Sequence, residues 1–222
     1  MEIAILGGTG DIGQGLALRW GYDTDHDIVI GSREAQKAES KASEYETELD
    51  SRGREVSIGA AENSAAAAGA DIVVAAVPAY HLTDTIESVT GALDEETILV
   101  SPAVGMKRDE AGFHYNRPGA GSVTALAAGA APEDVSVVGA FHNLPADRLA
   151  NLDADLGIDT LLVGDDADAR SIVADIASGI EGLRPLDAGG LANAAEIEGL
   201  TPLLINVAQH NDGLHDLGVR FD

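Results

Sequence analysis

The chain has 222 residues and a hydrophobic content of 45%, which suits one large α/β domain with at most a small second unit. Its 38 acidic residues outnumber its 13 basic ones, and the net charge of −25 disfavours nucleic acid and anionic membrane surfaces as partners. The absence of cysteine excludes disulfides, zinc–thiolate sites and cysteine nucleophiles.

The acidic residues are scattered along the chain, while lysines and aromatic residues are rare. This composition is typical of halophiles, whose salty cytoplasm screens the self-repulsion of such a protein. An acidic mesophilic protein is the alternative. The chain starts with a strand pattern rather than a secretion signal, and no apolar run reaches about 18 residues. We therefore expect a soluble, cytoplasmic protein.

A glycine-rich turn follows the first apolar run, residues 3–6, and helical spacing follows the turn. The pattern G-x-G-x-x-G falls on Gly8, Gly10 and Gly13. In a dinucleotide-binding fold these glycines allow the tight turn, the approach of a pyrophosphate and the packing of helix on strand. The strand before it and the helix after it are the required context, so we predict a dinucleotide site. A glycine loop of another α/β fold is the alternative.

The end of the second predicted strand, residues 27–30, distinguishes NADP from NAD. An NAD site would place an acidic residue there to bind the ribose hydroxyls. This chain instead has Ser32, Arg33 and, one helical turn later, Lys37. A hydroxyl and two cations suit a phosphate dianion, and cations are otherwise disfavoured at a helix N-terminus. We predict an NADP site, with a solvated helix start as the alternative.

The remaining pattern alternates strands and helices, which predicts a Rossmann-type doubly wound parallel sheet of order 3-2-1-4-5-6. We expect further strands at residues 56–58, 71–77, 97–100 and 135–140, and helices at residues 35–51, 60–69, 80–93 and 123–128. Residues 1–150 would form this NADP-binding domain. Residues 151–222 would form a smaller C-terminal α/β domain with a long helix at 191–209, kinked at Pro202.

Two stretches after predicted strands are candidates for ligand contact, because ligands of open α/β sheets bind at the carboxyl ends of the strands. Residues 103–118 read as a long irregular loop that gathers aromatic and basic residues. His142 follows the sixth predicted strand and is a candidate contact, although a histidine satisfied by the backbone is the alternative.

Groups for acid–base or nucleophilic catalysis are not apparent in the sequence. There is no G-x-S-x-G nucleophile elbow, and the six histidines form no H-x-x-x-H pair, so no metal site is predicted. A hydride transfer between two redox cofactors needs no such group, since the protein has only to position the cofactors and exclude water.

Several motifs together resemble one family, the coenzyme F420-dependent NADP oxidoreductases of archaea. The similarity runs over essentially the whole chain and is most specific in its C-terminal half. The matching segments are residues 5–19, 31–33 with Lys37, 101–102, 142–146 with 150–153, 164–166, 182–189 and 200–203. The resemblance implies reversible hydride transfer between reduced coenzyme F420, an 8-hydroxy-5-deazaflavin, and NADP. It also implies a homodimer.

The resemblance also implies roles for individual residues. The pyrophosphate would lie on Thr9, Gly10, Asp11 and Ile12, and the 2′-phosphate on Ser32, Arg33 and Lys37. The NADP cleft would be lined by Val77, Ala79, Thr83, Val104, Met106 and Ala146. The deazaflavin would lie near His142, Thr201 and Leu217, with His142 the candidate contributor to catalysis. Two positions depart from the family: Ala79 replaces a bulky aromatic residue, and Gly105 replaces a proline, which predicts a looser loop.

Two other functions share the N-terminal half of the pattern. A reductase of a small imine or carbonyl, of the pyrroline-carboxylate or ketopantoate type, would have a larger helical C-terminal domain than about 70 residues. A non-catalytic NADP-binding sensor would have no use for a second cofactor pocket.

Overall fold

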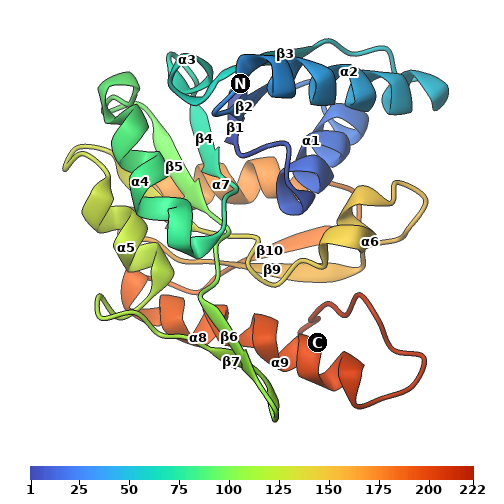
Figure 1. Ribbon diagram of the computed structural model, residues 1–222, viewed down its shortest axis with the longest axis vertical. Helices are drawn as coiled ribbons and strands as arrows, with labels where there is room; N and C mark the ends of the chain where they lie inside the picture. Colours follow the sequence, from blue (N-terminus) through green and yellow to red (C-terminus); the bar gives the residue numbers. More distant parts are fainter.

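The computed structural model describes residues 1–222 and is built around a six-stranded parallel sheet (Figure 1). The strand order is β3-β2-β1-β4-β5-β8, which confirms the predicted doubly wound topology. The six strands are β1 (Glu2–Leu6), β2 (Asp27–Ser32), β3 (Ile58–Glu62), β4 (Ile72–Ala75), β5 (Ile98–Ser101) and β8 (Ser136–Gly139). Helical crossovers between parallel strands place helices on both faces of the sheet.

Alternating side chains of each strand enter two different cores, because successive residues of a strand point to opposite faces. On β1, Ile3 and Ile5 belong to the larger core, whereas Ala4 and Leu6 belong to the smaller one. The larger core is covered by α1 (Asp11–Asp23), α2 (Ala35–Ser51) and α7 (Ala167–Ser178). The smaller is covered by α3 (Asn63–Ala67), α4 (Ala79–Val89) and α5 (Val123–Ala130). Every central strand is therefore buried on both faces, as its apolar sequence requires.

The C-terminal part is joined to the main sheet rather than separated from it. Strands β9 (Ile158–Leu162) and β10 (Leu183–Asp187) pair in parallel, and Val163 forms an antiparallel bridge with Gly139 at the end of β8. Helix α6 (Ala146–Ala150) packs on α1. Because the larger core contains residues from β1 through Leu183, the two parts fold around one hydrophobic interior.

Residues 103–118 form a β-hairpin, so the prediction of an irregular loop was wrong. Strand β6 (Met106–Asp109) pairs antiparallel with β7 (Gly112–Tyr115) around a two-residue turn at Glu110 and Ala111. The tight turn uses Gly112 at φ +122°, a conformation that favours glycine. At the base of the hairpin, a Cβ on Gly105 would come within 2.7 Å of the Asn116 carbonyl oxygen. Gly105 therefore permits a close approach of two chain segments and does not loosen the loop.

The helix expected over residues 191–209 is divided. It consists of a 3-10 turn (Leu191–Asn193), α8 (Ala194–Glu198) and α9 (Leu200–Gln209), with a break at Gly199. Pro202 lies in the first turn of α9. Because proline has no N–H and its ring clashes with the carbonyl four residues earlier, the regular helix is interrupted between Glu198 and Leu200. The helix is interrupted at Gly199, three residues before the predicted position, and α9 lies beside β7 of the hairpin (Figure 1).

The third strand was predicted at the wrong residues. Residues 60–62 were assigned to an alanine-rich helix, but they pair with Ile30, Gly31 and Ser32 of β2. Helix propensity is a weak preference, and here the pairing with β2 prevails. The predicted helix over residues 60–69 is accordingly reduced to α3.

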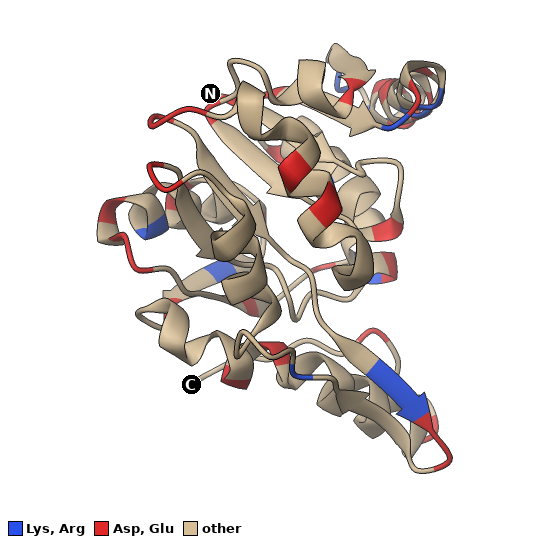
Figure 2. Cartoon of the chain, turned by 60° about the vertical axis from the view of Figure 1, so that its left-hand side comes forward, with Lys and Arg blue, Asp and Glu red and all other residues tan.

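Acidic residues are spread over surface helices and loops throughout the molecule (Figure 2). None of the helices combines the length and the apolar character that a bilayer crossing requires.

Candidate functional site

The glycine turn joins β1 to α1 with very little space around it. Gly7 adopts φ +72°, and its N–H donates to the Gly31 carbonyl at 3.0 Å. A Cβ on Gly13 would lie 2.6 Å from Cα of Gly8, so helix and turn pack at a distance that only glycine allows. Gly10 precedes α1, and no side chain caps this helix end. Free N–H groups at an uncapped helix start are a suitable site for an anion.

A cavity of about 510 Å³, which we call the nucleotide cavity, lies beyond the carboxyl ends of β1, β2 and β4. It brings together six of the predicted cofactor-binding residues: Thr9, Gly10, Ser32, Arg33, Lys37 and Val77. Asp11 and Ile12, also predicted, form the first turn of α1 beside it.

Arg33 and Lys37 are the cations of this cavity. Both side chains are exposed, and neither forms an ion pair, although eight ion pairs exist elsewhere in the chain. In a protein with 38 acidic residues, two neighbouring cations without an acidic partner indicate an external anion. The buried Ser32 adds a hydroxyl between them and the turn. A dianionic phosphate would satisfy all three groups.

Among the lining residues of the nucleotide cavity that sequence reasoning missed are Asn63 and His81. Asn63 begins α3, and its Oδ1 is buried without a hydrogen-bond partner. Such an orphaned acceptor costs free energy unless a donor binds it. The ring of His81 lies 4.4 Å from that of the exposed Tyr80, measured between centroids. A correct position for β3 would have placed Asn63 at a strand end, where ligand-binding residues are expected.

Four residues predicted to line the NADP cleft line neither the nucleotide cavity nor the second cavity of the molecule, which lies beside α9. Ala79 and Thr83 are on α4, Val104 precedes the hairpin, and Met106 begins β6 with 41% of its surface exposed. Their assignment to the cleft stays a prediction.

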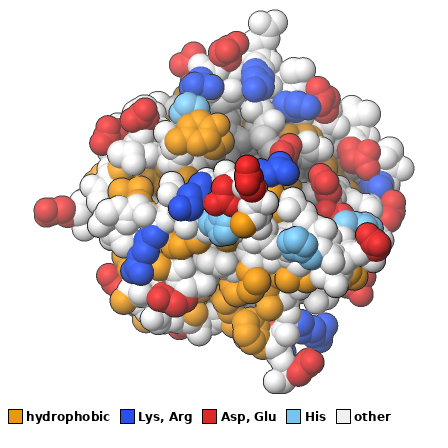
Figure 3. All heavy atoms as spheres, turned by 60° about the horizontal axis from the view of Figure 1, so that its bottom comes forward, with side chains coloured by type: hydrophobic (Ala, Val, Ile, Leu, Met, Phe, Trp, Pro, Cys, Tyr) orange, Lys and Arg blue, Asp and Glu red, His pale blue; other side chains and the backbone are white.

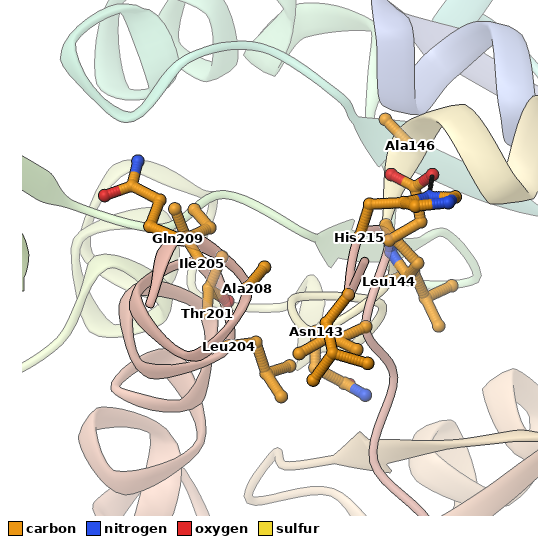
Figure 4. A pocket seen from close by; sticks show the side chains of 13 residues that line it. Asn143, Leu144, Ala146, Thr201, Leu204, Ile205, Ala208, Gln209 and His215 are labelled. Atoms are coloured by element: carbon orange, nitrogen blue, oxygen red, sulfur yellow. Dashed lines mark hydrogen bonds and ion pairs between the residues drawn. The ribbon is translucent and has the colours of Figure 1, made fainter. Parts of the chain in front are cut away.

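A second cavity of about 460 Å³, which we call the apolar cavity, lies between α9 and two other segments of the chain. These segments are residues 143–146, which follow β8, and residues 214–217, near the C-terminus. Thr201, Leu204, Ile205, Ala208 and Gln209 lie on one side, and Leu144, Ala146 and His215 lie on the other (Figure 4). Its remaining residues are Asn143, Pro145, Leu214, Asp216 and Leu217. The structure thus brings the predicted residues Ala146, Thr201 and Leu217 together.

The chain end is held in place against β9, which explains how residues 214–217 reach this cavity. The Asp159 N–H donates to the Val219 carbonyl at 2.7 Å, and the Asp159 carboxylate accepts from the Phe221 N–H at 2.6 Å. Arg184 forms two hydrogen bonds of 2.7 Å with the same carboxylate, and these hold the pKa of Asp159 below its usual value.

His142 lies beneath the apolar cavity and not in its wall. Its ring is buried, with Nε2 at 3.2 Å from Oγ1 of Thr124, while its carbonyl accepts from the Thr201 hydroxyl at 2.7 Å. Burial lowers the pKa of His142 from 6.5 to about 4, so the ring is neutral at neutral pH. As a ligand contact, His142 stays a prediction, and its backbone is the part that adjoins Thr201.

The sequence is similar to those of known proteins over nearly its whole length. The family model for NADP oxidoreductase, coenzyme F420-dependent, matches residues 2–105. An F420-dependent NADP reductase of Methanocaldococcus jannaschii is 37% identical over 93% of this chain and 92% of its own. That of Methanothermobacter thermautotrophicus is 36% identical over 99% of this chain and 94% of its own. The chain belongs to the F420-dependent NADP reductase family.

Solved structures agree with this reductase fold. A protein of Arthrobacter sp. FB24, provisionally named an F420-dependent NADP reductase, superimposes with a TM-score of 0.76 and 22% identity, covering 100% of this chain and 99% of that one. A pyrroline-5-carboxylate reductase of Coxiella burnetii gives a TM-score of 0.54 and 17% identity, and this chain covers only 58% of it. The likeness at these identities concerns the fold alone.

The buried His142 predicts a pH dependence of the stability of this reductase. Its pKa is about 4 when folded and about 6.5 when unfolded, so between these values only the unfolded chain binds the proton. The free energy of unfolding should therefore fall as pH is lowered from 6.5 towards 4, by on the order of 3 kcal/mol from this group. Chemical unfolding of the wild type and of His142→Gln across this range isolates the contribution. Parallel pH curves for the two proteins would contradict it.

Proposed function

We propose that the protein transfers a hydride reversibly between reduced coenzyme F420 and NADP⁺. The observation that carries the proposal is the presence of two dissimilar cavities beyond the carboxyl ends of the parallel strands. One has unpaired cations and a glycine turn, which suit a dinucleotide phosphate; the other has apolar walls, which suit a flat ring system. The membership of the family named for this reaction supports the same assignment.

The nucleotide cavity fits NADP in three respects. The uncapped start of α1 offers N–H groups to the pyrophosphate, and Thr9 and Gly10 lie at this point. Ser32, Arg33 and Lys37 supply donors for the 2′-phosphate. The orphaned Oδ1 of Asn63 accepts a hydrogen bond from a ligand hydroxyl or amine.

The apolar cavity fits the deazaflavin. Leu144, Leu204, Ile205 and Leu217 form its apolar surface, and Thr201 supplies a hydroxyl whose proton is already donated to the His142 carbonyl. When bound, the deazaflavin supplies the carbon that gives or takes the hydride. The chain's own residues bind and orient the two ring systems and exclude water between them, which is sufficient for transfer between aligned carbons. No acid–base residue is required by this assignment.

Different parts of the chain contribute most of the residues of the two cavities. Residues 1–150 form the NADP-binding part, and residues 151–222 close the deazaflavin site through α9 and residues 214–217. Ala146 at the start of α6 belongs to the first part and lines the apolar cavity together with residues 143–145, so both parts of the chain form the deazaflavin site.

The cellular setting is also a proposal. The net charge of −25 is best tolerated in the salty cytoplasm of a halophilic archaeon, where ions screen self-repulsion. The same charge argues against nucleic acid as a partner. The exposed apolar face of α9, with Leu203 at 55% and Val207 at 37% exposure, is compatible with a homodimer (Figure 3).

Two alternative functions predict different behaviour. A reductase of a small imine or carbonyl would resemble the pyrroline-5-carboxylate reductase, but this chain covers only 58% of that larger protein. A non-catalytic NADP sensor would bind the nucleotide and would leave the apolar cavity without a role.

A spectral exchange assay in molar salt separates the three functions. Purified protein mixed with reduced coenzyme F420 and NADP⁺ should restore the visible absorbance of the oxidised deazaflavin, and NAD⁺ should support this poorly. Oxidation of NADPH by a small imine or carbonyl, with no deazaflavin exchange, would favour the second function. NADPH binding without turnover of any acceptor would favour the sensor.

A further inference from the structure

A buried carboxylate lies at the bend between α8 and α9. Glu198 has no exposed surface, and its two oxygens accept four hydrogen bonds. Oε1 accepts from the N–H and the hydroxyl of Thr124, both at 2.9 Å. Oε2 accepts from the Val123 N–H at 2.9 Å and from the Tyr115 hydroxyl at 2.6 Å. No cation pairs with it, so these donors and the N-terminal end of α5 balance its charge.

The direction of these hydrogen bonds determines where the proton of the neighbouring histidine lies. A carboxylate only accepts, so the Thr124 hydroxyl must donate its proton to Glu198. The Thr124 oxygen can then only accept from the His142 ring, and Nε2 at 3.2 Å is the donor. The neutral His142 is therefore the Nε2–H tautomer, and its Nδ1 is a buried acceptor without a partner.

The segment that joins α8 to α9 also forms a hydrogen bond with the backbone of His142. Thr201 stands three residues after Glu198, across the Gly199 turn, and its hydroxyl donates to the His142 carbonyl at 2.7 Å. Residues 143–146, which follow His142 directly, form one wall of the apolar cavity, and Thr201 belongs to the opposite wall. His142 thus connects the two walls: its carbonyl bonds to Thr201 in one wall, its chain continues into the other, and its ring bonds to Thr124.

The hairpin is connected to this network at two points. The Tyr115 hydroxyl reaches Glu198, and the Asn206 side chain accepts from the Phe113 N–H at 2.8 Å and donates to the Phe113 carbonyl at 2.7 Å. Burial and the neighbouring Glu198 raise the pKa of Tyr115, which keeps it a hydroxyl donor. The hairpin therefore holds both the end of α8 and the middle of α9.

We propose that Glu198 is a positioning residue for the apolar cavity: through Thr124 it fixes the His142 ring as the Nε2–H tautomer, and with Tyr115 and Thr201 it sets the spacing of the two walls. The occupant of that cavity, the deazaflavin, rests on the proposed function, whereas the tautomer belongs to the protein alone.

Thr124→Val tests the link from Glu198 to His142, because it removes the hydroxyl and keeps the Thr124 N–H bond to Glu198. Nitrogen-15 NMR of the ligand-free protein should give one Nε2–H tautomer for His142 in the wild type and a mixture in Thr124→Val. Thr124→Ser, which restores the hydroxyl without the methyl group, should return the single tautomer. An Nδ1–H ring in the wild type, or an unchanged ring in Thr124→Val, would overturn the proposal.

Binding measurements test the effect on the cavity. Glu198→Gln should weaken the binding of coenzyme F420, followed by its fluorescence, by about tenfold, the value of one hydrogen bond. The Kd for NADP should change less than about twofold, since Glu198 does not line the nucleotide cavity. Thr124→Val should weaken deazaflavin binding in the same direction. Equal affinities for coenzyme F420 in folded variants and wild type would overturn the proposal.

A failure of the proposed function and a failure of the proposed role of Glu198 would give different results. If the wild type does not bind coenzyme F420 at all, the proposed function fails, and the NMR comparison still decides the role of Glu198. If Glu198→Gln does not fold, Thr124→Val provides both measurements, because it leaves the bonds from Val123 and Tyr115 to Glu198 in place.

Discussion

Replacement of Arg33 by alanine is expected to weaken NADP binding by about 1.5–3 kcal/mol, roughly 10- to 150-fold, and NAD binding much less. The loss arises because Arg33 has no acidic partner in the chain and is free to form a charge-assisted hydrogen bond with the 2′-phosphate, which NAD lacks. High salt reduces the size of the effect but not its direction.

Calorimetric titration of both nucleotides at two salt concentrations measures this difference. Arg52→Ala is a matched control, because it removes one positive charge at the opposite end of α2, where Arg52 and its partners, Glu48 and Asp153, lie outside the nucleotide cavity. The control should bind NADP like the wild type. An equal loss of NADP and NAD affinity in Arg33→Ala would show that Arg33 does not recognise the phosphate.

Replacement of Arg19 by methionine should lower the free energy of unfolding by about 3 kcal/mol or more. Only 3% of the Arg19 surface is exposed, and its guanidinium donates to four backbone carbonyls, those of Arg148, Leu149, Asn151 and Ala154. Methionine fills a similar volume but leaves buried acceptors without donors. Since these bonds hold α6 and the loop after it against α1, the loss should also disturb Ala146 in the apolar cavity.

Urea unfolding in high salt measures the effect of Arg19→Met. Arg117→Met is the control, because Arg117 is exposed and makes one hydrogen bond, to the Gly121 carbonyl at 2.6 Å. The control should change the free energy of unfolding by less than about 0.5 kcal/mol. A loss below about 1 kcal/mol in Arg19→Met would mean that water replaces the four hydrogen bonds at little cost.

Local features of the chain were predictable from sequence. The glycine turn, the apolar strands and the absence of an acid after β2 depend on neighbouring residues, and these patterns predicted the sheet order and an NADP-type site. Pro202 similarly indicated that the helix over residues 191–209 would not be regular, and the structure divides it at Gly199. In each case the physical cause lies within about one turn of helix or one strand.

Features that depend on distant contacts were not predictable. Glu198 lies in a helical stretch with Glu196, where an acidic residue normally faces solvent, and its burial is due to α5 and Tyr115, more than 70 residues away. The hairpin was missed because all four residues of β6 are exposed and three of them are charged, so no apolar alternation marks it. Asn63 was missed because alanine-rich residues 60–62 favour a helix until β2 offers hydrogen bonds.

The central claim is that two bound cofactors exchange a hydride directly between the nucleotide and apolar cavities. Coenzyme F420 reduced so that both hydrogens of its hydride-donating carbon are deuterium, incubated with the protein and NADP⁺ in ordinary water and molar salt, tests this claim most directly. Mass spectrometry of the product should find one deuterium in each NADPH formed, because direct transfer admits no exchange with solvent. NADPH without deuterium, or no NADPH from a folded protein that binds both cofactors, would contradict it.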